Sequence, residues 1–275
     1  MVVHLLDGTY ELFRHFYGQR RFNKGEDPPY GAVIGVLNTV LQMLETGATH
    51  IAVATDHVIE SFRNDLWDGY KTGDGIDPAL WRQFEPLEES LVSMGVATWP
   101  MVELEADDGL ASGARLAAED PRVEKVCIWT PDKDLAQSVR GERVVQVDRK
   151  SGKIRDAAGV REKFGVDPER IPDYLALVGD SADGYPGVAG IGAVTAARLV
   201  AKYGAIEDFP PDILSERHEL ALLFKKLATL RDDAPLFTNV DELQWRGPGP
   251  DFPATAEKLG DVRLVARANK AVERG

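Results

Sequence analysis

The sequence predicts an α/β fold, with a central and mainly parallel sheet flanked by helices, and a smaller α-helical region after it. Short apolar runs alternate with segments of helical spacing along the first part of the chain, which is the pattern of a parallel sheet covered by helices. After a polar turn at residues 151–153 the chain changes character, and helical patterns with glycine-rich turns follow. We therefore expect an α/β domain over residues 1–165 and a helical region over residues 166–275.

Four apolar runs predict the main strands of the sheet. They cover residues 2–6, 51–55, 126–130 and 144–147, the last as an edge strand, and a weaker run at 96–99 predicts one more. Three of the runs are followed by acids, namely Asp7, Asp56 and the pair Asp132 and Asp134. In parallel sheets, ligands bind at the carboxyl ends of the strands. The acids are therefore expected to meet at one edge of the sheet.

Apolar residues at helical spacing predict the helices. They cover residues 9–17, 29–45, 78–94, 166–178, 193–202 and 216–231. A further helix, rich in Ala and Leu, begins near Glu105, Asp107 and Asp108. Acids at a helix start cap free amides and favour the positive end of the dipole, and this simpler interpretation stays open. Helical spacing puts Glu105 and Asp108 on one face, and carboxylates that stay ionised together need a cation, so we also expect a metal site.

Composition bounds the class of protein. A chain of 275 residues can bury a sizeable core. Its one cysteine, Cys127, lies in an apolar run, which excludes a disulfide within the chain and favours a reducing cytoplasm. The N-terminus lacks the pattern of a signal peptide, and no stretch approaches the roughly 20 apolar residues of a membrane span. We expect no membrane partner.

The net charge of −13 argues by itself against a nucleic-acid partner, whose footprint on a protein is usually basic. Divalent cations bound among the acids would return positive charge to the place where a phosphate lies. Local cations also occur: Arg20, Arg21 and Lys24 form a small basic cluster, and cations alternate with aromatic residues in Ser61-Phe62-Arg63 and Gly69-Tyr70-Lys71. That alternation suits a phosphate-bearing polymer, although the aromatic residues fit a packing role equally well.

A glycine-rich segment predicts a hairpin in the helical region. Its residues are Gly187, Val188, Gly190, Ile191 and Gly192, with the two apolar side chains placed to pin the turn. Such a hairpin points its amides outward, and the helix that follows presents its positive end. Together they would form a cradle for a DNA phosphate. A simple corner between two helices is the alternative.

Taken in order, these motifs resemble those of the bacterial and phage flap endonuclease, or 5'-to-3' exonuclease, family, which includes the 5'-nuclease domain of bacterial DNA polymerase I. The resemblance runs from about Val3 to about Phe209. The motifs that carry it are Leu6-Asp7-Gly8, Asp56 with Ser61-Phe62-Arg63, Gly69-Tyr70-Lys71, Glu105-Ala106-Asp107-Asp108, Thr130-Pro131-Asp132-Lys133-Asp134-Leu135, Gly179-Asp180 with Asp183, and Pro186-Gly187-Val188 through Gly190-Ile191-Gly192. They occur in the order of the family. The resemblance implies a PIN-like nuclease domain with a helix-hairpin-helix subdomain.

The resemblance also implies two sites for Mg²⁺ or Mn²⁺. The ligands of the first would be Asp7, Asp56, Glu105 and Asp107, those of the second Asp132, Asp134, Asp180 and Asp183, with Asp108 close to both. Hard carboxylate oxygens suit these ions, and two ions about 4 Å apart can stabilise the attacking and the leaving oxygens of a phosphodiester. Some stand-alone relatives lack part of the second set. Every position is filled here, which favours an active two-metal enzyme.

The implied reaction is in-line attack of water on a phosphodiester of DNA, at a 5' flap, a nick or a 5' junction of duplex and single strand. Lys71 and Arg14 would contact the scissile phosphate, with Arg63 supporting them. The hairpin would grip the duplex backbone without reading sequence, with the K⁺ ion that is common in the family. Tyr10 or Phe13 would stack on a terminal base or pack in the core.

Two positions depart from the family pattern. The loop after Lys71, residues 72–77, lacks the further basic residue that relatives place there, so an arch near residues 69–95 would be weakly basic or short. Gly184 stands where the family has Asn. The chain leaves no room for a polymerase domain. We therefore expect a stand-alone, monomeric nuclease that acts at the bacterial nucleoid in replication and repair, including the processing of Okazaki fragments.

Two other functions stay open at this point. A metal-dependent ribonuclease of the related PIN-like fold would explain the acids but not the hairpin at residues 187–192. A non-catalytic protein that binds branched DNA would explain the hairpin but not the complete set of acids.

Overall fold

The described part of the chain is residues 1–23 and 28–273 of a computed structural model, without the side chains of residues 19–23. The basic cluster predicted at Arg20, Arg21 and Lys24 lies outside the described side chains. Within the described part, no helix combines the length and the apolar character that crossing a membrane requires.

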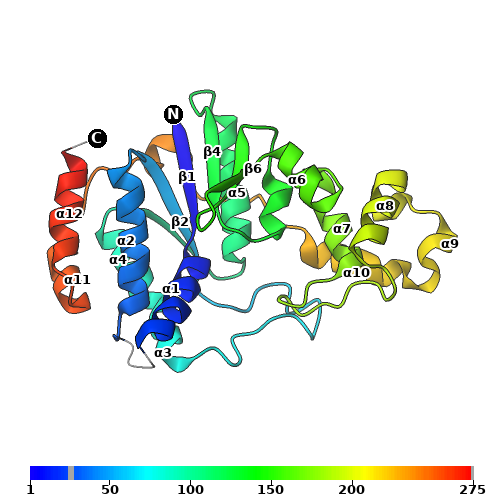
Figure 1. Cartoon of the computed structure of the whole chain (residues 1–275), viewed down its shortest axis with the longest axis horizontal. Helices are drawn as coiled ribbons and strands as arrows, with labels where there is room; N and C mark the ends of the chain where they lie inside the picture. Colours follow the sequence, from blue (N-terminus) through cyan, green and yellow to red (C-terminus); the bar gives the residue numbers. More distant parts are fainter. Residues whose placement is uncertain (24–27, 274–275) are drawn as a thin grey trace.

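A six-stranded sheet lies at the centre of the molecule (Figure 1). Its strands are β1 (Val2–Asp7), β2 (His50–Asp56), β3 (Ala97–Met101), β4 (Lys125–Trp129), β5 (Val144–Asp148) and β6 (Lys153–Arg155). Across the sheet they run β3-β2-β1-β4-β5-β6, and all neighbours are parallel except β5 and β6. The prediction of a mainly parallel sheet is confirmed. The register pairs Asp7 with Ala54, so the acids that end β1 and β2 lie at the same edge.

Helices cover both faces of the sheet and form a subdomain beside it. The α-helices are α1 (Gly8–Asn23), α2 (Gly31–Glu45), α3 (Pro78–Trp81), α4 (Phe84–Ser93), α5 (Ala106–Glu119), α6 (Ala157–Phe164), α7 (Ile171–Val178), α8 (Ala193–Tyr203), α9 (Pro211–Leu214), α10 (His218–Ala228), α11 (Phe252–Leu259) and α12 (Arg263–Val272). The 3-10 helices are η1 (Asp134–Ser138), η2 (Pro168–Arg170), η3 (Ile206–Asp208), η4 (Ser215–Arg217) and η5 (Val240–Leu243).

The alternation of side chains along β1 builds two cores. Leu6 is buried with apolar residues of α1, α2, α4, α11 and α12 on one face, whereas Val3 and Leu5 are buried with those of α5 on the other. Successive strand residues point to opposite faces, so both faces of a covered parallel strand are apolar. The two layers of helices cover the faces of the sheet, and the carboxyl ends of its strands carry the acids.

The segment predicted as one helix over 78–94 is two helices. Pro86 has no amide hydrogen and its ring crowds the preceding turn, so the helical hydrogen bonding is interrupted between α3 and α4. The side chain of Gln83, in the break, accepts hydrogen bonds from the amides of Ala32 at 3.0 Å and Val33 at 3.3 Å. The break therefore caps the start of α2.

The segment predicted to hold an arch, residues 69–95, has a different structure. Residues 57–77, all of them described, contain no helix or strand, and this loop crosses the open edge of the sheet (Figure 1). Its continuation α4 is a core helix, with Leu87 and Leu91 buried against α2 and β3. The arch is thus limited to a loop and the single turn of α3.

The first two elements after β5 were not predicted individually, and neither were the helices α9, α11 and α12. β6 pairs antiparallel with β5 through a turn at residues 149–152, so β6 rather than β5 forms this edge of the sheet. α6 follows, with its N-terminal Asp156 accepting a hydrogen bond from the amide of Gly159 at 2.8 Å. The strand is only three residues long and its burial is low, so it carries little apolar pattern.

The region predicted as helical over 166–275 divides by its packing. Helices α7, α8 and α10 share a core of their own beside the sheet, with Leu177, Val200 and Phe224 buried in it. The chain then returns to the sheet domain, where Trp245 donates from its amide to the Thr49 carbonyl at 2.9 Å. α11 and α12 pack on α4 and α2 at the far side of the molecule (Figure 1).

Candidate active site

The acids at the ends of β1 and β2 are held by helix starts and hydroxyl groups. Asp7 accepts from the amide of Tyr10 at 2.8 Å, in the first turn of α1, and from the hydroxyl of Thr130 at 2.9 Å. Asp56 accepts from the amide of Ala106 at 2.8 Å, at the start of α5. Each carboxylate is therefore fixed by a free helix amide and keeps further lone pairs for a ligand.

A pocket of about 410 Å³ lies at this edge of the sheet. Carboxylates from five segments line it, namely Asp7, Asp56, Glu105, Asp107, Asp132 and Asp183. We call these six residues the acidic pocket. Asp132 was predicted with the second metal set, but it lines the pocket together with the first. Tyr10 and Phe13 of α1 and the loop residues Lys71 and Ile76 also line it.

A second cluster adjoins the acidic pocket. Carboxylate oxygens of Asp134, Asp180 and Asp183 all lie within 4.8 Å of one another. Asp180 and Asp183 come from the turn after α7, whose backbone is held by the paired bonds of Asp180 with Tyr185. Oδ1 of Asp134 and the hydroxyl of Tyr185 are both buried and have no hydrogen-bond partner among the described residues.

The carboxylates resist being ionised together. Burial, followed by the charges of Asp56 and Asp132, raises the pKa of Asp7 to about 7, against the hydrogen bonds that favour its charged form. Burial also raises the pKa of Asp107 well above its usual range, and Asp132 and Asp7 add to the effect. For Asp134, burial and then the charges of Asp132 and Asp183 raise the pKa in the same way. The positive charge near these acids does not offset their burial and mutual repulsion.

Two lysines supply part of that charge. Nζ of Lys71 lies 2.8 Å from Oε2 of Glu105 and 3.0 Å from Oδ1 of Asp183, so it joins the acidic pocket to the second cluster. Burial alone would lower the pKa of Lys71, but these two carboxylates raise it well above its usual value. The ammonium of Lys133 pairs with Asp180 in the second cluster.

The residues fit divalent cations. The donors are hard carboxylate oxygens, which Mg²⁺ and Mn²⁺ prefer. Oδ1 of Asp134 is an orphaned buried acceptor, and buried charges of one sign persist only when paired or bound to a metal. The raised pKa values of Asp7, Asp107 and Asp134 point the same way, since a cation would remove the repulsion that raises them.

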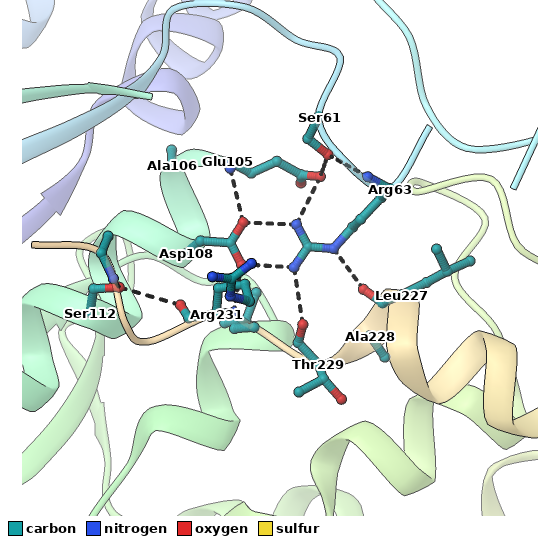
Figure 2. A network of polar contacts seen from close by, with 12 residues as sticks. Ser61, Arg63, Glu105, Ala106, Asp108, Ser112, Leu227, Ala228, Thr229 and Arg231 are labelled. Carbon is teal, nitrogen blue, oxygen red and sulfur yellow. Dashed lines mark hydrogen bonds and ion pairs between the residues drawn. The ribbon is translucent and has the colours of Figure 1, made fainter. Parts of the chain in front are cut away.

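Asp108 and Arg63 lie behind the acidic pocket, which corrects two expectations. Asp108 is fully buried, and its two oxygens accept from both terminal nitrogens of Arg63 and from the amides of Glu105 and Arg231 (Figure 2). It does not line the pocket. The side chain of Arg63 is 1% exposed, so it has no surface with which to support a phosphate contact.

Arg14, also predicted as a phosphate ligand, lies one turn beyond Tyr10 on α1. Its guanidinium pairs with Glu11, with 2.5 Å between Nη2 and Oε2, and its side chain is 32% exposed. Arg14 does not line the acidic pocket. It faces solvent from the helix that carries Tyr10 and Phe13.

The predicted hairpin joins α7 to α8. Val188 is buried and donates to the carbonyl of Leu177 at 2.9 Å, and Ile191 donates to that of Val188 at 3.0 Å. Gly187 has φ of 71°, and a Cβ there would lie 2.4 Å from the amide nitrogen of Gly179, so only glycine fits. Gly190 is exposed. The turn is pinned from within, and its tip points outward.

Gly184, the departure from the family pattern, lies where two loops touch. Its φ is 86°, and a Cβ would lie 1.9 Å from the carbonyl oxygen of Gly69. The indole of Trp67 donates to the Gly184 carbonyl at 3.1 Å, and the amide of Lys71 to that of Asp183 at 2.9 Å. The missing side chain thus lets the loop that carries Lys71 approach the loop that carries Asp183.

Two residues of the site were not predicted. Lys133 follows a strand end, and that position is the signal by which the sequence could have indicated it. Tyr185 shows no such signal, because only the backbone pairing with Asp180 brings it near the second cluster. Its pKa is raised by burial and then by Asp134 and Asp183.

Comparison with known proteins gives the family. Residues 2–165 match the family described as 5'-3' exonuclease, N-terminal resolvase-like domain, and residues 166–251 match that described as 5'-3' exonuclease, C-terminal SAM fold. The chain is 36% identical to DNA polymerase I of Pseudomonas aeruginosa over 87% of this chain and 28% of the polymerase. It spans about a third or less of this polymerase and of the DNA polymerases I of Bacillus caldotenax and Bacillus subtilis.

Shorter relatives and solved structures agree. The chain is 28% identical to the 5'-3' exonuclease of Aquifex aeolicus over 95% of this chain and 92% of that protein. It superposes on the zinc-bound T5 5'-exonuclease with a TM-score of 0.68 and 17% identity over 99% of both chains. The catalytic core of Rad2 in complex with DNA substrate gives 0.57 and 14% over 98% of this chain and 91% of that one. These two likenesses show a shared fold, and with the family matches running from residue 2 to residue 251, the chain belongs to the 5'-3' exonuclease family of nucleases.

Proposed function

We propose that this protein is a structure-specific 5' nuclease that hydrolyses DNA phosphodiester bonds at 5' flaps and 5' ends. The observation that carries the proposal is the convergence of carboxylates from five separate segments on one pocket and its adjoining cluster, with Lys71 between them. The names of the relatives support it: those from Buchnera aphidicola and Aquifex aeolicus are called 5'-3' exonuclease, and they are close to this chain in length.

The acidic pocket and the second cluster would hold two divalent cations. Asp7, Asp56, Glu105 and Asp107 would serve the first, and Asp134, Asp180 and Asp183 the second, with Asp132 beside the first set. Mg²⁺ or Mn²⁺ bound there would orient the phosphodiester and neutralise the charge that develops on its oxygens. The hydroxyl of Thr130 and the amides of Tyr10 and Ala106 hold Asp7 and Asp56 in place for this role.

Lys71 would contact the scissile phosphate. Its side chain is 32% exposed and reaches the pocket from the loop that crosses the sheet edge. With cations in the pocket, Glu105 and Asp183 have other partners, and the ammonium is released to donate to a phosphate oxygen. Arg14 would hold the strand one helical turn farther out on α1. Tyr10 and Phe13, both on the pocket wall, would meet the terminal base.

The hairpin over residues 186–192 would grip the duplex. Its exposed tip at Gly190 and the free amides at the start of α8 suit a phosphate of the backbone, which carries no sequence information. A K⁺ ion would be held by the hairpin carbonyls. Specificity would then come from the shape of the DNA. We place the enzyme in the bacterial cytoplasm as a monomer, where it would remove 5' flaps in replication and repair, including those of Okazaki fragments.

The test is cleavage of a 5'-flap duplex labelled at either end, with Mg²⁺ and then Mn²⁺, beside a matched single strand. Asp107→Asn serves as the inactive control. We expect cuts near the junction that disappear with the single strand and with the control variant, and the product lengths separate endonuclease from exonuclease action. Cleavage of RNA alone would instead indicate a ribonuclease, and tight flap binding without cleavage in either ion would indicate a non-catalytic binder of branched DNA.

A further inference from the structure

Arg63 is the largest of the fully buried side chains in the described part of the chain. It lies in the loop after β2, and its guanidinium hydrogen-bonds only to groups far away in sequence, at Glu105, Asp108, Leu227 and Thr229. A buried guanidinium costs several kcal/mol of desolvation unless its charge and its hydrogen-bond donors are matched. The partners of Arg63 therefore indicate what holds it inside the protein.

All five N–H donors of Arg63 are used (Figure 2). Its Nη1 donates to Asp108 at 2.8 Å and to Glu105 at 3.1 Å, and its Nη2 donates to Asp108 at 2.7 Å and to the carbonyl of Thr229 at 3.1 Å. Its Nε donates to the carbonyl of Leu227 at 2.8 Å. We call Arg63 and these four partners, Glu105, Asp108, Leu227 and Thr229, the Arg63 network. The planar fork meets the carboxylate of Asp108 with two parallel bonds, which Lys could not do.

Asp108 has no acceptor capacity left for a cation. Oδ1 accepts from Nη2 of Arg63 and from the amide of Arg231 at 2.8 Å, and Oδ2 accepts from Nη1 of Arg63 and from the amide of Glu105 at 2.9 Å. Four donors saturate the lone pairs of one carboxylate. Asp108 is therefore the partner of Arg63 and not a member of the acidic pocket.

Glu105 joins the Arg63 network to the acidic pocket. Its Oε1 accepts from Nη1 of Arg63 and from the hydroxyl of Ser61 at 2.6 Å, on the inner side. Its Oε2 lies 2.8 Å from Nζ of Lys71, on the side of the pocket, and accepts from the hydroxyl of the buried Tyr70 at 3.3 Å. Arg63 and Ser61 thus anchor one oxygen of Glu105, and the other oxygen faces the pocket. Outer partners of this kind orient the ligands of a metal and are worth roughly tenfold to a hundredfold in its affinity.

The other end of the Arg63 network lies at the end of α10. The carbonyls of Leu227 and Thr229 are at the C-terminus of that helix, where carbonyl groups lack helical partners and a cation is favoured by the dipole. α10 packs directly on α7, which leads to the hairpin. The guanidinium therefore ties the helical subdomain to the start of α5.

We propose that Arg63 and Asp108 are positioning residues, which fix the Glu105 carboxylate toward the metal site and fasten α10, and with it the hairpin, to the same helix start. The inference rests on the proposed function for its consequence in catalysis. Its structural content is independent of that function: the network orients a carboxylate and closes a contact between two parts of the chain that are more than 120 residues apart.

The test uses three variants of the full chain. Arg63→Lys keeps the charge and loses the fork, and Asp108→Asn keeps the shape and loses the charge. Arg115→Lys is the matched control: Arg115 lies on α5, as Asp108 does, and donates to a backbone carbonyl, that of Asp232, but its side chain is 38% exposed. Circular dichroism melting establishes which variants are folded. If Arg63→Lys does not fold, Asp108→Asn decides by the same measurements.

The first measurement is a titration with Mn²⁺ without DNA, in which the electron paramagnetic resonance signal of free Mn²⁺ reports how much of the ion is bound. We expect Arg63→Lys and Asp108→Asn to bind as many ions as the parent protein, with affinity lower by roughly tenfold to a hundredfold for the ion held by Glu105. Arg115→Lys should match the parent. Unchanged affinity in folded variants would overturn the positioning role, and loss of a whole ion in Asp108→Asn would make Asp108 a ligand.

The second measurement is amide hydrogen exchange over residues 225–234. Faster exchange in Arg63→Lys and Asp108→Asn than in Arg115→Lys is the expected result, and equal exchange would refute the tie to α10. A third readout applies if the parent cleaves flap DNA: the Mg²⁺ concentration for half-maximal rate should rise in the variants while the rate at saturating Mg²⁺ recovers. If the parent cleaves nothing, the proposed function fails, but ion binding and exchange still decide this inference.

Discussion

The acidic pocket and the Arg63 network lie on either side of the start of α5, and both are built on carboxylates. They differ in the supply of donors. Asp107 faces the pocket, where other acids surround it and raise its pKa. Asp108, the next residue, accepts four hydrogen bonds and is fully buried. Asp107 and Asp108 thus have opposite roles. A carboxylate with few hydrogen-bond donors around it can bind a cation, whereas one that already accepts four hydrogen bonds has a structural role.

Of the variants that distinguish the metal site from the Arg63 network, Asp134→Asn is expected to have the largest effect on cleavage. Asp134 has a buried oxygen without a partner among the described residues, so the change removes a metal ligand and relieves repulsion. Flap cleavage should fall by about a thousandfold, the scale of losing several kcal/mol of charge stabilisation. Melting in EDTA should occur at the same temperature or higher. A single-turnover assay and a melting curve measure both, and a strongly destabilised variant would place Asp134 with the structural carboxylates.

Lys71→Ala comes next. The ammonium of Lys71 forms ion pairs with both Glu105 and Asp183. We expect its loss to slow single-turnover cleavage by roughly tenfold to a thousandfold, the effect of losing one transition-state contact. DNA binding in Ca²⁺ should change little. Lys258→Ala removes an exposed lysine paired with Glu89 and is the control. A rate equal to that of the control would leave Lys71 as a partner of the carboxylates alone.

Most of the fold could be predicted from the sequence, because it depends on local pattern. The runs at 2–6, 51–55 and 126–130 are strands, and the acids that follow them meet at one edge. The exceptions have local causes too. Pro86 interrupts the helix expected over 78–94, and β6 is too short and exposed to show a pattern.

Which carboxylates face the metal site and which have a structural role could not be predicted. The difference depends on which carboxylates accept hydrogen bonds, and the groups that take part in these hydrogen bonds come from remote segments. The amide of Arg231 donates to Asp108 from more than 120 residues away, and the carbonyls of Leu227 and Thr229, which accept from Arg63, are equally remote. No spacing within Glu105-Ala106-Asp107-Asp108 distinguishes the acid that faces the pocket from the acid that Arg63 saturates. The close approach of the Gly184 and Gly69 backbones could not be predicted either, because the two residues are remote in sequence.

A smaller effect is expected from pH in the absence of divalent cations. Burial and neighbouring acids give Asp7 a folded pKa of about 7, far above its ordinary value. Between about pH 4 and 7 this group binds a proton in the folded state but not in the unfolded state, so its contribution to stability falls as pH rises. We expect urea denaturation in EDTA to give a loss of order 2 kcal/mol between pH 5 and 7.5 that is absent in Asp7→Asn.

Mg²⁺ provides the control for that experiment, since a bound cation should remove the pH dependence by favouring the ionised form. If wild type and Asp7→Asn have the same slope in EDTA, Asp7 is ionised in the folded protein without a metal. The acidic pocket would then not differ from the Arg63 network in the way that its pKa values indicate.

The smallest effect tests the border of the Arg63 network. Ser112 is fully buried on α5, and its hydroxyl accepts from the amide of Ala234 at 3.1 Å and donates to the carbonyl of Arg231 at 3.4 Å. Ser112→Ala leaves that amide unsatisfied and should cost about 1 kcal/mol of unfolding free energy, measured by urea denaturation. Cleavage and Mn²⁺ affinity should stay at the wild-type values, because the Ser112 hydroxyl bonds to the backbone of Arg231 and Ala234 and not to the carboxylates of Glu105 and Asp108. A drop in Mn²⁺ affinity would mean that the segment around Arg231 also sets the position of the Asp108 carboxylate, and that the network extends farther along α5 than the contacts of Arg63.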